Sequence, residues 1–213
     1  MPADLSTILM KNKILTIIPV FIILVAAVIF SLMWYKDYQR THKAYLYCND
    51  HVITKPEYVY YYNSYKQYYI SSFSNFFSYM GVDESIELEG QEYENGKTFG
   101  QMFDEEVLEQ IKETYALCDD AEKNGFEFDA EAKFNEFYSM VEESCRASNT
   151  STDSYFRQFY GEDINTKLVR EYMTRGFYAA AYYDRLIENT SYDDAYIYVN
   201  ELKKDYQTRF ADD

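Results

Sequence analysis

The sequence lacks the residues on which several common classes of active site depend. It has two histidines, His42 and His51, and it contains no glycine-rich phosphate loop and no dinucleotide-binding fingerprint. Two histidines nine positions apart provide neither a set of zinc ligands nor a recognisable partner for a catalytic nucleophile. Without a phosphate loop the chain also has no recognisable nucleotide site. We therefore expect no cofactor, and we assign no catalytic residue.

Cysteine, proline and glycine are scarce as well. The three cysteines, Cys48, Cys118 and Cys145, are odd in number and far apart, so we expect small buried residues rather than a disulfide scaffold. No proline follows Pro56, and the whole chain has 7 glycines. A chain with so few backbone breaks favours helices joined by short turns.

Positive charge is scarce in the larger part of the chain. The whole sequence has 20 Lys and Arg against 36 Asp and Glu. From residue 44 onward the numbers are 15 and 34, which is a formal net charge of −19. Binding to nucleic-acid phosphates needs a basic surface, so this composition excludes a nucleic-acid partner.

Residues 14–34 form a long apolar run that contains no charged residue. At 1.5 Å per residue, such a run crosses the roughly 30 Å of hydrocarbon in a bilayer, and Trp34 and Tyr35 follow it as an aromatic anchor. We therefore expect residues 1–43 to be a cytoplasmic tail and a transmembrane anchor in the lipid bilayer. A cleaved signal peptide stays open, and the Lys and Arg on the two sides do not fix the orientation.

Beyond residue 43 the pattern of apolar residues is mostly helical. Residues 44–54 are the exception, because two short β-prone runs flank Asn49 and Asp50 and predict a small hairpin. Helices are then expected to begin at Thr54, Thr98, Asp129, Asn165 and Ser191, with a short extra helix ending at Gly161 and the last helix running through Phe210. The prediction is an all-α domain of five to six helices over residues 44–213, with a short β-hairpin-like leader.

The first of these helices has an unusual composition. Residues 58–69 contain seven tyrosines in twelve positions. At 100° per residue most of the rings share one face, whereas the alternation expected of a strand fails at residues 60–62. We expect this helix to continue to about Gly81, with Phe73, Phe76 and Met80 in the core.

Tyrosine keeps a hydroxyl group that needs water or a partner when the ring is buried. A dense set of tyrosines therefore suggests a partly wet groove, in which aromatic rings provide contact area at a low entropic cost. The residues predicted to bind a client polypeptide in this groove are Tyr58, Tyr61, Tyr62, Tyr65, Tyr69, Tyr172 and Tyr183. The alternative is that the same rings are ordinary core residues.

One segment has the spacing of a calcium-binding loop. Asp120, Glu122, Asn124 and Glu131 fall at positions 1, 3, 5 and 12 of such a loop. Glu122 is long for its position, and a helical hairpin closed by Gly125 explains the same residues. We therefore expect no metal site, with these four residues as a weak calcium candidate.

The order of these features resembles the N-terminal chaperone domain of the SurA and PrsA foldases. The resemblance covers about residues 44–210 and is carried by the segments Val52-Ile53-Thr54-Lys55-Pro56-Glu57, Ala121-Glu122-Lys123-Asn124-Gly125, Tyr160-Gly161 and Val169-Arg170-Glu171-Tyr172. In those foldases, a helix like the one expected from Ser191 leads into a parvulin-type prolyl isomerase domain. No residue of this chain matches the isomerase site.

The resemblance implies a non-catalytic, chaperone-like module that binds unfolded or secreted polypeptides. It also implies a single-pass protein of the cell membrane whose large domain, residues 44–213, is extracytoplasmic. Two alternatives stay open: a structural or assembly subunit of a cell-envelope complex with one fixed partner, and a truncated peptidyl-prolyl isomerase. A homodimer is also open, and any enzymatic activity would follow only from the family association.

Overall fold

The computed structural model describes residues 25–36, 38–39 and 41–211, and it separates the chain into two compact units between Lys43 and Ala44. In the first unit, residues 25–36 are helical and exposed. Residues 14–24, which belong to the expected transmembrane run, lie outside the described residues.

The structure does not support the predicted transmembrane anchor. A membrane-spanning helix needs about 20 predominantly apolar residues. Within residues 25–36, 38–39 and 41–211, no helix is both long enough and apolar enough to cross a membrane. This finding contradicts the predicted localisation as a single-pass protein of the cell membrane with an extracytoplasmic domain.

The second unit begins with the hairpin that the sequence predicts. β1 (Ala44–Cys48) and β2 (His51–Thr54) pair in antiparallel register, and Asn49 adopts a left-handed conformation in the turn, with φ of 50°. A third strand, β5 (Thr208–Phe210), pairs with the other edge of β1. Residues from both ends of the unit therefore meet in one small sheet.

The strand β5 corrects the prediction of a final helix through Phe210. Helix α7 (Tyr192–Lys204) ends earlier, and the chain turns back toward the hairpin. The Asn49 side chain accepts a hydrogen bond from the backbone N–H of Gln207 at 2.9 Å and donates one to the carbonyl of Asp205 at 3.1 Å. Pairing with the free edge of β1 outweighs the helical preference of this segment.

The other helices of the second unit follow the predicted order. They are α2 (Lys55–Phe73), α3 (Phe99–Lys123), α4 (Ala130–Ala147), α5 (Thr152–Tyr160) and α6 (Thr166–Asn189). The predicted caps Thr54, Thr98, Asp129, Asn165 and Ser191 each accept a hydrogen bond from the first helical turn. The unit is mostly helical as predicted, although its two small sheets mean that it is not purely α.

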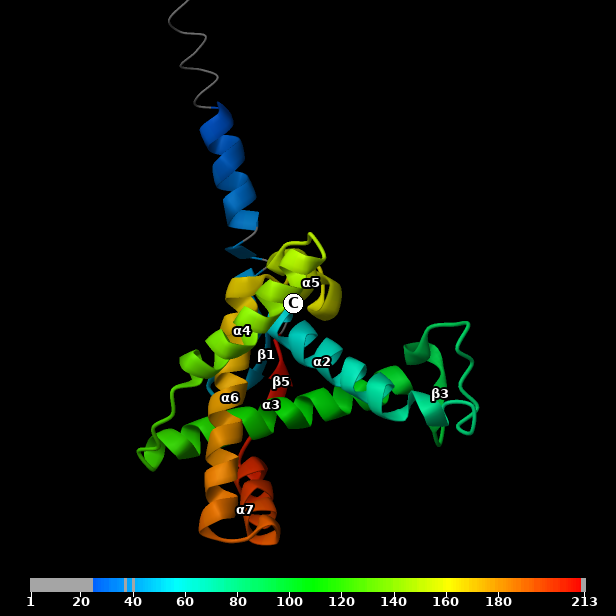
Figure 1. Cartoon of the computed structure of the whole chain (residues 1–213), viewed down its shortest axis with the longest axis vertical. Helices are drawn as coiled ribbons and strands as arrows, with labels where there is room; N and C mark the ends of the chain where they lie inside the picture. The colour runs from blue at the N-terminus through cyan, green and yellow to red at the C-terminus, as the bar shows by residue number, and fades with distance from the viewer. Residues whose placement is uncertain (1–24, 37, 40, 212–213) are drawn as a thin grey trace, which may run out of the picture. The chain divides into compact units, whose positions relative to one another are not determined.

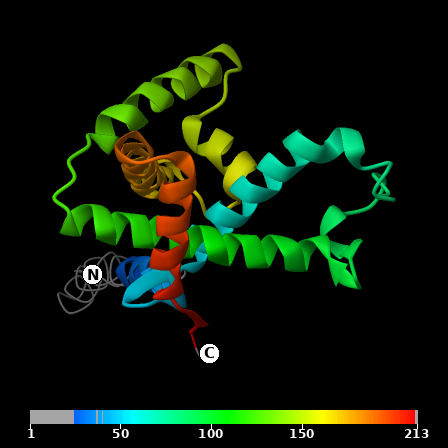
Figure 2. The ribbon, with the colours of Figure 1, turned by 90° about the horizontal axis from the view of Figure 1, so that it is seen from below.

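Helix α3 is the central element of the second unit. It packs against α2, α6 and α7. Figure 1 shows α6 and α7 at one part of α3, while α2 descends beside its other part toward β3 (Glu92–Glu94). In Figure 2 the ribbons of α2 and α3 again lead to one end of the unit, away from the three-stranded sheet.

That end of the unit has its own small core, and we call residues 66–103 the arm. The arm contains the end of α2, two short 3-10 turns (Ser74–Phe76 and Leu88–Gly90), a two-stranded hairpin and the start of α3. The hairpin consists of β3 (Glu92–Glu94) and β4 (Lys97–Thr98). The buried residues of the arm are Tyr69, Phe77, Leu88, Phe99, Met102 and Phe103.

The first helix is shorter than predicted. Helix α2 ends at Phe73 instead of near Gly81, and a 3-10 turn and irregular turns follow. Because the helical period stops there, the expected core positions Phe73, Phe76 and Met80 are 40%, 56% and 39% exposed. The prediction that these three side chains belong to the core is therefore wrong.

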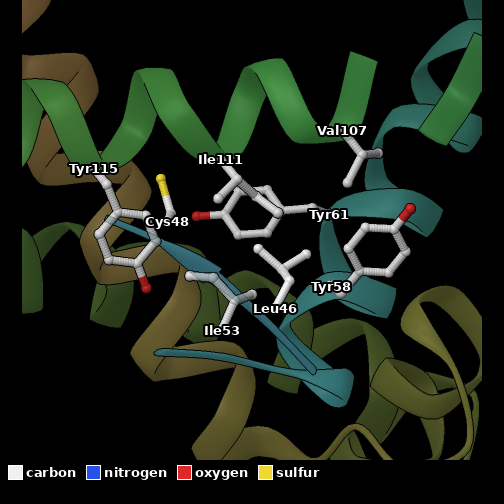
Figure 3. Close-up of a cluster of buried hydrophobic side chains, with 8 residues drawn as sticks. All are labelled: Leu46, Cys48, Ile53, Tyr58, Tyr61, Val107, Ile111 and Tyr115. Carbon is white, nitrogen blue, oxygen red and sulfur yellow. The ribbon is translucent and has the colours of Figure 1, made fainter. Parts of the chain in front are cut away.

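The main core joins the hairpin of β1 and β2 to α2 and α3. Figure 3 shows Leu46, Cys48 and Ile53 of the hairpin facing Tyr58 and Tyr61 of α2 and Val107, Ile111 and Tyr115 of α3. A second cluster lies among α4, α5 and α6, around Phe134, Phe156 and Val169. The three cysteines are free and buried, as predicted.

Candidate functional site

The tyrosines predicted to bind a client do not form one open groove. Tyr58, Tyr61 and Tyr69 expose 6–7% of their surface, and Tyr172 exposes 2%. Figure 3 shows the rings of Tyr58 and Tyr61 among the side chains of the hairpin and α3. These four rings are core residues. Tyr62, Tyr65 and Tyr183 are partly buried, and their role in binding a client stays a prediction.

The hydroxyl groups of the buried rings differ in their hydrogen bonding. Tyr58 donates a hydrogen bond to Oδ1 of Asp104 at 2.5 Å, and the Tyr172 hydroxyl lies 3.5 Å from Oγ1 of Thr54. The Tyr61 hydroxyl is buried, and its contact with the Thr114 side chain falls short of ordinary hydrogen-bond geometry. Burial is also the main reason why the pKa of Tyr172 rises to about 12. These contacts hold the helices together and leave little ring surface for a ligand.

Large exposed apolar side chains gather instead in the arm. Tyr79 is 87% exposed, and Tyr68 and Ile86 are each 60% exposed. The full set comprises Tyr68, Phe73, Phe76, Tyr79, Met80, Ile86 and Tyr93. We call these seven side chains the arm patch. Exposed apolar side chains that collect in one region mark a surface for interaction.

The arm core holds the arm patch in place from beneath. The ring of Tyr69 lies 4.8 Å from that of Phe73 and also contacts the rings of Phe77, Phe99 and Phe103. The exposed ring of Tyr93 packs edge-on against Phe99 at 5.2 Å. The exposed rings of Phe73 and Tyr93 therefore belong to the same aromatic network as the buried rings, which fixes where these two rings lie.

One glutamine organises the loop that carries Ile86. The side-chain amide of Gln91 donates to the carbonyls of Asp83, Ile86 and Glu87, at 2.8, 3.3 and 3.3 Å. Its oxygen accepts the backbone N–H of Asp83 at 2.7 Å. This role is not predictable from the sequence, because it depends on how the loop closes around one side chain.

The same loop is also tied to both helices of the arm. Lys66 of α2 forms an ion pair with Glu89. A side chain at Gly100 of α3 would place its Cβ 3.1 Å from the carbonyl oxygen of Glu89, so glycine allows the loop to lie directly on the helix. The loop is therefore a fixed part of the arm.

A second exposed aromatic surface lies on α7. Tyr192, Tyr196 and Ile197 are 62%, 57% and 58% exposed. All three lie in the first half of one helix. This surface offers fewer large apolar groups than the arm patch.

A buried charged group was missed by the sequence analysis. Glu57, in the first turn of α2, exposes 3% of its surface. Its carboxylate forms an ion pair with Arg175 of α6 and accepts a hydrogen bond from Tyr115 of α3 at 2.8 Å. The spacing of Thr54 and Glu57 is that of a reciprocal helix cap, but the Glu57 carboxylate contacts Arg175 and Tyr115.

A cavity of about 610 Å³ opens beside Arg175 and Tyr115. Its other lining residues include His51 and Asp119, which are joined at 2.9 Å. The hydroxyl of Tyr206 donates to the same Asp119 oxygen at 2.5 Å. The polar groups of this wall therefore bind one another, and they link the hairpin to α3, α6 and the C-terminal segment.

The weak calcium candidate is not assembled as a loop. Helix α3 continues through Lys123, so Asp120 and Glu122 lie within the helix. Asp120 is buried and accepts hydrogen bonds from Tyr182 and Tyr198, each at 2.8 Å. Glu131 pairs instead with Arg170 at 2.6 Å. In the described ranges of the chain, no group of three His, Cys, Asp or Glu side chains is placed to hold a metal ion.

No known protein family, no curated protein and no solved structure matches this chain. The resemblance to the SurA and PrsA foldases therefore stays a prediction. The interpretation of the arm patch rests on its own geometry and charge.

Proposed function

We propose that residues 44–211 are a non-catalytic, chaperone-like module that binds unfolded or extended polypeptide segments through the arm patch. The observation that carries this proposal is the exposure of seven large apolar side chains on an arm that has its own buried aromatic core. Exposing apolar side chains to water is unfavourable, so a group of them on one arm is typical of a binding surface. The proposal keeps the predicted class of partner but moves the contact surface from the buried tyrosines to the arm patch.

The chemistry of the arm patch suits variable partners. Aromatic rings supply contact area with few rotatable bonds, so little entropy is lost when they bind. Met80 adds a flexible and polarisable group that adapts to different shapes. Because Tyr68, Phe73, Phe76 and Tyr79 follow one another closely along the chain, an extended segment can contact more than one of these rings. Each contact is weak, which allows rapid release.

The surface on α7 favours a second candidate function. Tyr192, Tyr196 and Ile197 lie on one regular helix, and a regular face suits one partner of matching shape. This arrangement would suit a structural or assembly subunit with one fixed partner. The two functions use different surfaces, so variants can separate them.

The test compares two triple variants of the whole chain. The arm variant is Phe76→Ser with Tyr79→Ser and Ile86→Ser, and the matched control is Tyr192→Ser with Tyr196→Ser and Ile197→Ser on α7. Binding to a fluorescently labelled, permanently unfolded polypeptide is measured by anisotropy, and circular dichroism and thermal unfolding report the fold. We expect binding to weaken at least about tenfold in the arm variant, because central aromatic contacts dominate such interfaces. Binding should be unchanged in the control variant.

Two results would count against the proposal. If both variants fold and the arm variant binds the unfolded polypeptide as tightly as the original chain, the arm patch is not the contact surface. If only the α7 variant loses binding, the second candidate function gains support.

A further inference from the structure

We infer that the arm patch selects polypeptide segments in which large apolar side chains lie close to Lys or Arg. This inference rests on the proposed function and adds the chemical class of the client. It follows from the charges that the fold places beside the exposed rings. The charges that have no partner there are all negative.

The loop of the arm is strongly acidic. Residues 82–96 contain six carboxylates and no Lys or Arg. The six are Asp83, Glu84, Glu87, Glu89, Glu92 and Glu94. Ile86 and Tyr93 of the arm patch lie within the same stretch. Carboxylates and exposed apolar groups are therefore interleaved on one short segment.

Three of these carboxylates form an ion pair or hydrogen bonds within the arm. Glu89 pairs with Lys66, Asp83 accepts hydrogen bonds from the backbone and side chain of Ser85, and Glu92 accepts the backbone N–H of Gly96 at 3.0 Å. The hydrogen bonds to Ser85 hold the pKa of Asp83 below its usual value, so this group stays ionised.

The other three carboxylates have no cationic partner among the residues that the structure describes. Glu84, Glu87 and Glu94 are exposed, and none of them takes part in an ion pair there. The nearest lysine along the chain, Lys97, is itself paired with Glu105 at 2.6 Å. The loop thus presents three unpaired carboxylates on the same stretch as the exposed side chains of Ile86 and Tyr93.

A basic and apolar segment satisfies both features of this surface. Its apolar side chains would contact the exposed rings, and its Lys or Arg would lie near Glu84, Glu87 and Glu94. Exposed ion pairs each contribute little, so we expect a combined preference of about fivefold over a neutral segment at low salt. The preference should shrink as salt screens the charges.

The same charges disfavour other occupants of the arm patch. A second copy of the chain would bring the same acidic loop against itself, and like charges that face each other across an interface oppose association. Nucleic-acid phosphates would be repelled for the same reason. Charge complementarity therefore favours a basic polypeptide.

The experiment uses three labelled peptides that share one apolar core of Leu, Phe and Val. Their flanking residues are Lys in the first peptide, Gln in the second and Glu in the third. Dissociation constants are measured with the whole chain at about 20 mM and at about 300 mM salt, where screening differs strongly. The loop variant is Glu84→Gln with Glu87→Gln and Glu94→Gln. The control variant, Glu127→Gln with Glu143→Gln and Glu162→Gln, changes the net charge equally at exposed positions outside the arm.

At low salt we expect the original chain and the control variant to bind the Lys peptide about fivefold more tightly than the Gln peptide. The loop variant should bind both peptides equally, with its affinity for the Gln peptide unchanged. The inference is overturned if the loop variant keeps the preference, or if the original chain shows none. In those cases the proposed function survives as long as the Gln peptide still binds through the arm patch. If the original chain binds none of the three peptides, the proposed function fails as well.

Discussion

The guanidinium of Arg175 in α6 binds the buried carboxylate of Glu57 in α2, although the two residues are 118 positions apart. The Tyr115 hydroxyl donates to the same carboxylate oxygen, and the Arg175 guanidinium lies 4.8 Å from the centre of the Tyr115 ring. This group of three side chains therefore joins α2, α3 and α6. It fixes the base of α2, the helix that leads into the arm.

Replacing Arg175 should destabilise the second unit. Arg175→Met leaves the Glu57 carboxylate buried without its counter-charge, and such a loss costs about 3 kcal/mol. The free energy of unfolding, measured by urea denaturation, should fall by that amount. In the double variant Glu57→Gln with Arg175→Met no charge is stranded, so it should be more stable than Arg175→Met alone. A double variant that is less stable than the single variant would contradict this account.

The same pair predicts a pH dependence of stability. Burial raises the pKa of the Glu57 carboxyl, while Arg175 and the hydrogen bond from Tyr115 oppose the rise. Because the pKa in the folded chain lies above that in the unfolded chain, the contribution of this group is complete below the unfolded pKa and is lost as the pH rises through the folded pKa.

Arg175→Met should extend this loss to higher pH, because it removes the positive charge that lowers the Glu57 pKa. Unfolding free energies between about pH 4 and about pH 8 should therefore fall more steeply with rising pH in Arg175→Met than in the original chain. Glu57→Gln combined with Arg175→Met removes the titrating group, so the additional slope should disappear. Equal slopes in all three proteins would refute the assigned role of Glu57.

Two buried tyrosines of α2, Tyr61 and Tyr58, should respond in opposite ways to loss of the hydroxyl. Tyr61→Phe removes a buried hydroxyl whose contact with Thr114 falls short of ordinary hydrogen-bond geometry, so it should raise the free energy of unfolding by about 1 kcal/mol. Tyr58→Phe removes the hydrogen bond to Asp104 and should lower it by about 1 kcal/mol. Chemical denaturation of the two variants tests the pair. A loss of stability in Tyr61→Phe equal to that in Tyr58→Phe would show that Tyr61 has a hydrogen-bond partner.

Loss of the Gln91 side chain should loosen the loop of the arm. The backbone N–H of Asp83 donates to the side-chain oxygen of Gln91 at 2.7 Å, so Gln91→Ala should expose that N–H to exchange. We expect its exchange with deuterium to accelerate at least about tenfold, while amides in α6 keep their protection. Gln158→Ala, at an exposed position of α5, serves as the control. Unchanged protection at Asp83 in Gln91→Ala would mean that the loop is held by other contacts.

Local features of the fold were predictable from the sequence. Thr54 and Thr98 cap their helices because the cap depends only on residues within one turn. The turn at Asn49 was predictable for the same reason, since asparagine tolerates the left-handed conformation. These features need no knowledge of the rest of the chain.

Features that depend on distant segments were not predictable. β5 exists because β1 offers a free edge, and nothing within residues 208–210 signals that pairing. The neighbouring rings Tyr68 and Tyr69 differ in exposure, 60% against 6%, because only Tyr69 faces the side chains of α3. The helical period beyond Phe73 gave a wrong core for Phe76 because the helix ends there.

Cross-linking is the most direct test of the central claim that the arm patch binds polypeptide segments. An unfolded polypeptide that carries several photoreactive groups is bound to the chain and irradiated, and the linked residues are identified by mass spectrometry. The account predicts that the cross-links concentrate between Tyr68 and Tyr93. Cross-links concentrated on α7 instead, or spread evenly over the surface of residues 44–211, would contradict it.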